Sequence, residues 1–126
     1  MRAKNYRLLA ATVLLAGSAL LAYAHHSFPV LFDPATDVTV AGIVKEFEFK
    51  APHSYIRIDA DDANGGTIPW ELETASPGQL IRLGLTPDTL PAGARIAAAG
   101  NPARDGRRLM RLRMLTLPSG ETLQLQ

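Results

Sequence analysis

The residues with the clearest chemical potential are three histidines, His25, His26 and His53, of which two are adjacent. The segment Ala22–Ala24 precedes them and has the A-x-A pattern that signal peptidase prefers. Cleavage after this segment would leave His25 at the N-terminus, where its α-amine and ring Nδ1 can chelate one metal ion. Imidazole binds copper, nickel and zinc, and copper leads the divalent affinity order. The pattern therefore predicts a metal site at the mature N-terminus.

The predicted ligands are His25, His26 and His53, with Asp33 as a possible carboxylate neighbour. Copper is the expected ion and zinc the second choice. The alternative interpretation is that cleavage merely happens to precede two histidines and that His53 caps its own loop. A single chain leaves both interpretations open.

The first residues have the features of an export signal. Arg2, Lys4 and Arg7 form a basic start, and the apolar run 8–21 is shorter than the roughly 20 residues that span a bilayer. We therefore expect a Sec-type signal peptide over 1–24, an N-terminal arm over 25–37 and a single domain over 38–126. The mature protein would be periplasmic or secreted, with no stable membrane insertion after cleavage.

Charge and cysteine content limit the classes of function and the kinds of stabilisation that the sequence favours. The sequence holds 12 acidic residues, and all of them follow the expected cleavage point, so the mature chain is slightly acidic. Such a balance does not favour nucleic-acid binding. With no cysteine, an exported chain has no disulfides and depends on its hydrophobic core.

Period-two hydrophobicity predicts an all-β domain with one short helix. Gly42 lies near the middle of a long first strand and is the expected place for a bend or bulge. Ser76, Pro77 and Gln79 form a helix-start signal, and Gly84 ends that helix. The expected strands occupy 38–49, 55–59, 67–73, 95–100, 107–117 and 122–126. Three strands, a helix and two or three strands predict a five- to six-stranded OB-like β-barrel, with a two-sheet sandwich as the alternative.

The same alternation predicts the barrel interior and its surface. Apolar side chains of 28–32 are expected to dock on the domain as an extended arm. The acid pairs Glu71/Glu73 and Asp61/Asp62 are interpreted as solvated surface, and the arginine-rich stretch 104–113 as a strand that protects an edge. The residues expected inside are Ile56, Ile58, Trp70, Leu72, Met110, Leu112 and Met114.

Several motifs extend over nearly the whole expected mature chain. They are His25-His26-Ser27-Phe28, Phe32-Asp33, 38–44, Glu46-Phe47, Pro52-His53-Ser54-Tyr55, Trp70-Glu71, Ser76-Pro77, Pro91-Ala92-Gly93 and Gly100-Asn101-Pro102-Ala103. Together they resemble the small secreted bacterial proteins of domain-of-unknown-function family 6152. The resemblance implies a secreted β-rich domain and no established activity.

The sequence thus favours an exported OB-like β-barrel that binds a transition metal through its histidines and acts as a carrier or chaperone. No nucleophile elbow or phosphate-binding loop indicates an enzyme. The main alternative is a metal-free periplasmic module that binds another periplasmic protein through Tyr55 and Arg57. Copper-dependent oxidative catalysis is a third possibility.

Processing provides the first test. Intact mass or Edman sequencing of the protein exported by its own signal should give His25 as the first residue. A mature chain that begins elsewhere would lack the amine chelate and would contradict the predicted N-terminal site.

Overall fold

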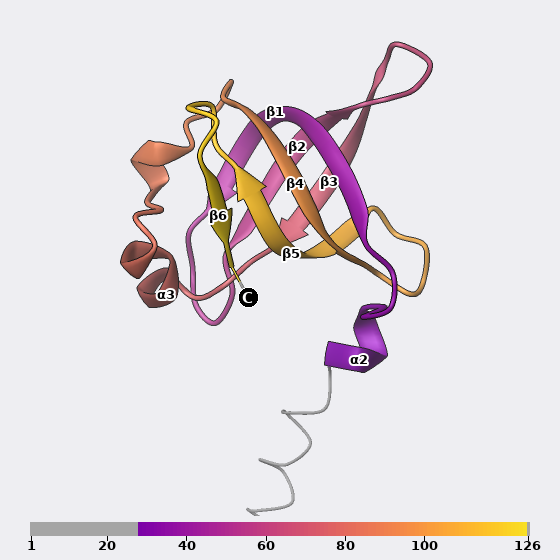
Figure 1. Ribbon diagram of the computed structural model, residues 1–126, viewed down its shortest axis with the longest axis horizontal. Coiled ribbons are helices and arrows are strands. Elements are labelled where there is room, and N and C mark those ends of the chain that lie inside the picture. The colour runs from indigo at the N-terminus through magenta and orange to yellow at the C-terminus, as the bar shows by residue number, and fades with distance from the viewer. Residues whose placement is uncertain (1–27, 126) are drawn as a thin grey trace, which may run out of the picture. The chain divides into compact units, whose positions relative to one another are not determined.

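The computed structural model describes residues 28–125. Six strands form one sheet in the order β3-β2-β1-β4-β5-β6, and a parallel pairing between β3 and β5 closes five of them into a barrel (Figure 1). β6 is an additional strand on β5. This connectivity confirms the predicted OB-like barrel. The elements are α2 Phe28–Leu31, β1 Val38–Glu48, β2 Tyr55–Asp61, β3 Thr67–Glu73, α3 Pro77–Arg82, the 3-10 helix η1 Pro87–Thr89, β4 Arg95–Pro102, β5 Leu109–Thr116 and β6 Thr122–Gln124.

Strand β1 belongs to both walls of the barrel, since it pairs with β2 along one edge and with β4 along the other. Gly42 permits a close approach to β2, because a Cβ at this position would overlap the carbonyl oxygen of Asp59. The bulge itself lies at Lys45, where the register shifts between Val44 and Glu46. Near the predicted bend, β1 therefore has two features: the close approach of Gly42 to Asp59, and the bulge at Lys45 three residues later.

The helix between β3 and β4 begins and ends where the sequence predicted. The Gln79 side-chain oxygen accepts the backbone N–H of Ser76 at 3.3 Å, and Gly84 follows the helix with a φ of 77°. Leu80 of α3 is completely buried and belongs to the barrel core. The helix thereby covers one end of the barrel, as Figure 1 shows.

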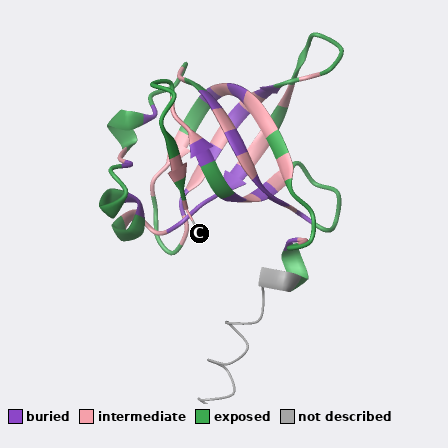
Figure 2. Cartoon of the chain, in the orientation of Figure 1, coloured by how far each residue is buried: buried purple, intermediate pink, exposed green. Residues whose placement is uncertain are grey.

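Buried residues alternate along the strands (Figure 2), and most of the predicted interior is confirmed. Met114 is one exception, because the residue is 46% exposed. β4 and β5 shift register between Ala99 and Gly100, so that Ala99 pairs with Met114 while Gly100 pairs with Leu112. The bulge reverses the alternation on β5, and Leu115 is buried instead. The confirmed interior residues are Ile56, Ile58, Leu72, Met110 and Leu112.

Two further expectations need correction. Trp70 packs against the core but is only partly buried. The segment expected to be an extended arm forms the helical turn α2, and Phe32 after it is buried and forms a β-bridge with Ala103. The compact unit that contains the barrel begins at Phe32. Within the described residues, no helix is long and apolar enough to cross a membrane.

Two methionines of β5 test this register. Met110→Ala should lower the free energy of unfolding by about 2–5 kcal/mol because it empties part of a closed core. Met114→Ala should change it by less than about 0.5 kcal/mol, because the side chain lies on the surface. Urea denaturation of both variants measures the difference. Equal losses would contradict the bulge and restore the simple alternation.

Candidate functional site

The loop between β1 and β2 is fixed to the chain that follows β3. Ser54 donates its backbone N–H to the Ala75 carbonyl at 3.0 Å and accepts the Thr74 N–H at 2.9 Å. Its hydroxyl also bonds the backbone of Lys50 across the loop. These bonds hold the neighbouring His53 beside the end of β3.

His53 contacts the carboxylate of Glu73, with 2.7 Å between Nδ1 and Oε1. A carboxylate only accepts hydrogen bonds, so the imidazole proton lies on Nδ1 when the ring is neutral. The lone pair then lies on Nε2. The His53 side chain is 44% exposed, whereas that of Glu73 is only 12% exposed. This arrangement presents one oriented ring nitrogen to the surroundings.

Glu73 is anchored by Arg111, whose guanidinium lies 3.2 Å from Glu73 Oε1 and also donates to the Thr74 carbonyl at 2.9 Å. The two residues are partners in the parallel β3–β5 pairing. Tyr55, the partner of Glu73 on β2, also interacts with it. Burial raises the pKa of the Tyr55 hydroxyl, and the negative charge of Glu73 raises it further. Glu73 thus has hydrogen-bond donors on both sides, Arg111 and Tyr55, and its carboxylate holds the His53 ring in position.

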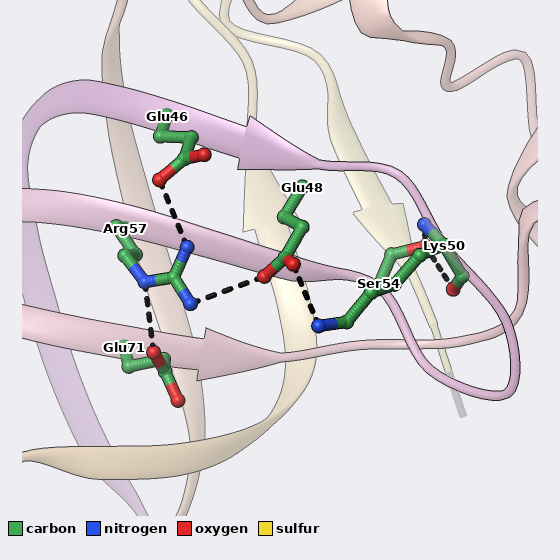
Figure 3. Close-up of polar contacts among 6 residues, drawn as sticks. All are labelled: Glu46, Glu48, Lys50, Ser54, Arg57 and Glu71. Carbon is green, nitrogen blue, oxygen red and sulfur yellow. Dashed lines mark hydrogen bonds and ion pairs between the residues drawn. The ribbon is translucent and has the colours of Figure 1, made fainter.

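A second charged network lies on the same wall of the barrel (Figure 3). Arg57 on β2 contacts Glu46 at 2.9 Å, Glu48 at 3.1 Å and Glu71 at 2.9 Å, which come from β1 and β3. Lys50 contacts Glu48 at 2.6 Å, and this hydrogen bond is the main cause that lowers the pKa of the Glu48 carboxyl. The Arg57 guanidinium therefore already uses all three of its nitrogens within the protein.

Asp33, the predicted carboxylate neighbour, lies in a turn before β1. Its oxygens accept the Thr36 hydroxyl at 2.7 Å and the Ala35 N–H at 3.2 Å. These bonds, and Arg104 at 3.5 Å, lower the pKa of the Asp33 carboxyl, and the Thr36 hydroxyl contributes most. The partners of Asp33 and of His53 are thus different residues.

His25 and His26 lie outside the described residues. Within residues 28–125, no three histidine, cysteine, aspartate or glutamate side chains gather into a group that could hold a metal. Of the predicted ligands, the described part of the chain contains His53 and Asp33, which have different contacts. Any complete site must draw on further donors.

Sequence reasoning missed Glu73 and Arg111. Alternation placed both on the outer face, and the solvated interpretation is wrong for both, since Glu73 is buried and the Arg111 side chain is only 15% exposed. Glu71 is partly exposed and pairs with Arg57. The available signal in the sequence was that Glu73 ends an expected strand in a chain that also carries many arginines. That signal does not indicate which arginine lies next to Glu73.

A family model described as "Family of unknown function (DUF6152)" matches residues 12–111. Neither curated proteins nor solved structures gave a match.

Tyr55 gives a test of this cluster. In a chain that begins at His25 it is the only tyrosine, so near-ultraviolet absorbance reports its ionisation alone. Its midpoint should lie above the ordinary value of about 10, and Glu73→Gln should lower it by removing the neighbouring negative charge. Because the folded pKa is raised, the stability linked to Tyr55 is present below the ordinary pKa and is lost as pH rises through the folded one. A midpoint unchanged by Glu73→Gln would mean that the two side chains do not interact.

Proposed function

The chain belongs to the family of unknown function DUF6152, and we propose that it binds a transition metal, copper first and zinc second, as a carrier or chaperone. The proposed location is the bacterial periplasm or the exterior, after removal of a signal peptide over 1–24. His53 is the ligand supplied by the barrel. His25 and His26 are the further ligands supplied by the mature N-terminus.

The observation that carries the proposal is the 2.7 Å contact between His53 Nδ1 and Glu73. Histidines that bind metals commonly donate their other ring N–H to a carboxylate, which fixes the tautomer and strengthens the ligand nitrogen. Arg111 in turn keeps Glu73 in place. A histidine that served only to cap its loop would not need this chain of supporting contacts.

One imidazole cannot retain a transition metal by itself, so the proposal requires His25 and His26. Asp33 would have to exchange its contact with the Thr36 hydroxyl for the metal, which makes it an accessory ligand.

The metal-free alternative, a binding module that uses Tyr55 and Arg57, has less support. All three guanidinium nitrogens of Arg57 already contact carboxylates, so a partner would have to displace at least one of them. The test of metal binding separates the two functions.

Copper binding should be measured by competition with a chelator of known affinity, on protein that begins at His25. We expect nitrogen-dominated hyperfine structure in electron paramagnetic resonance. His53→Ala should weaken binding at least about tenfold, or ~1.4 kcal/mol. Glu73→Gln should weaken it by about tenfold or more, because it removes the charge that supports the ring.

Glu71→Gln is the matched control. It removes a carboxylate two residues earlier on the same strand, which contacts Arg57 and not His53, and it should leave copper affinity unchanged. If His53→Ala binds copper as the parent does, the barrel supplies no ligand and the metal-free module becomes the better hypothesis.

A further inference from the structure

We propose that a groove on the outer face of β1, β2 and β3 binds an acidic saccharide, and that Arg108 recognises the carboxylate of this ligand. The groove uses none of the side chains around His53 and does not depend on metal binding, so this function goes beyond the one proposed above. Its volume is about 350 Å³, at the lower end of the roughly 300–1,000 Å³ that is typical of small-molecule sites. A small ring or a short stretch of a chain fits such a groove.

The lining of the groove is largely apolar. Ile58 of β2 contributes to it, as do Pro69 and Trp70 of β3. Trp70 also packs against the barrel core, which holds it in place. An apolar lining with a few polar groups is typical of sites for small organic molecules. The C–H groups of a sugar ring can cover such a surface, whereas an inorganic anion cannot.

Two ion pairs order the charged side chains along the groove. Lys45 contacts Asp59 at 3.3 Å. Arg57 contacts Glu71 at 2.9 Å, as Figure 3 shows. A carboxylate has about four acceptor sites, so Asp59 and Glu71 retain capacity for hydroxyl donors. The groove therefore suits a ligand that carries hydroxyl groups.

Arg108 is the cation that these pairs leave over. It lies in the loop before β5, is exposed and lines the groove. Within residues 28–125, its side chain makes no hydrogen bond or ion pair. A guanidinium in this state suits a carboxylate of the ligand, which it can bind through two parallel hydrogen bonds. The other four arginines of the stretch 104–113 each contact a carboxylate: Arg104 contacts Asp33, Arg107 contacts Asp105, Arg111 contacts Glu73 and Arg113 contacts Asp37.

The backbone of Arg108 is held at the seam of the barrel. Its carbonyl accepts the Glu71 N–H at 2.9 Å, and the next residue, Leu109, pairs with Glu71 between β3 and β5. The residue that would bind a carboxylate and the residue that would accept a hydroxyl are therefore neighbours across this seam.

A phosphate-rich chain suits this wall less well. Glu46 and Glu48 contact Arg57 from the same side as Glu71, so the wall carries several carboxylates that repel closely spaced phosphates. A uronate-type saccharide has a carboxylate on each ring and several hydroxyls, and these hydroxyls can donate to Asp59 and Glu71. The groove thus favours an acidic saccharide over an oligonucleotide.

The test uses trigalacturonate as the probe and its methyl ester as the neutral control with the same rings and hydroxyls. Trp70 is the only tryptophan of the chain and lines the groove, so its fluorescence reports occupancy. Protein that begins at His25 is titrated in the presence of a metal chelator, and calorimetry repeats each titration. We expect saturable binding of the acid and at least about tenfold weaker binding of the ester, which lacks the charge that Arg108 recognises.

Arg108→Gln should weaken binding of the acid at least about tenfold and leave that of the ester unchanged, and as a surface substitution it should not unfold the protein. Arg107→Gln is the matched control, because Arg107 is an exposed neighbour that contacts Asp105 and does not line the groove. It should change neither affinity.

The inference is overturned if neither method detects saturable binding of the acid, if the ester binds as tightly, or if Arg107→Gln costs as much affinity as Arg108→Gln. It is also overturned if a single-stranded oligonucleotide binds more tightly than trigalacturonate and loses affinity in Arg108→Gln, since the groove would then bind phosphate. Each of these outcomes leaves the metal-carrier function standing, because copper binding is measured separately.

Discussion

The constraint on which the structure depends is that one strand, β1, must serve both walls of a small barrel. A straight strand cannot pair with β2 along its second half and with β4 along its first half while the sheet closes. Gly42 allows the backbones to approach where a side chain would collide with Asp59, and the bulge at Lys45 adds local twist. Closure then brings the end of β3 beside β5, although these strands are distant in sequence and run parallel.

The candidate site is a consequence of that closure. Glu73 and Arg111 meet only because β3 and β5 pair, and each would be an ordinary surface residue on an open sheet. A buried carboxylate without a partner is costly, so the contacts from Arg111 and His53 are needed for the arrangement to be tolerated at all. The site is therefore built into the seam of the barrel, where the backbone is held on both sides. The contact with Glu73 and the backbone hydrogen bonds of Ser54 hold His53 against this seam.

The two charged networks on this wall differ in how far they are exposed to water and in how much they contribute to stability. The Arg57 network lies at the surface, with the Arg57 side chain 40% exposed and that of Glu46 59% exposed, and exposed ion pairs contribute little to stability. It aligns three neighbouring strands without being essential to the fold. The Glu73 network is smaller but largely shielded from water, so each of its contacts is stronger and harder to replace. The same wall thus contains one network that is replaceable and one that positions the His53 ring.

The sequence by itself determined the order of strands and helix, the ends of α3, and most of the barrel interior, because these depend on local propensity and on a side-chain period of two. It also determined that the chain contains three histidines and no cysteine. Only the tertiary structure decided that Glu73 and Arg111 form a largely buried pair, since sequence alternation cannot show which outward faces become covered when a sheet closes. The exposure of Met114 likewise depended on a bulge, which inserts one residue and reverses the alternation without any signal in local composition. The contact between His53 and Glu73 also depended on the tertiary structure. The path of the backbone brings this loop histidine to the carboxylate, and the spacing of the two residues along the chain does not indicate it.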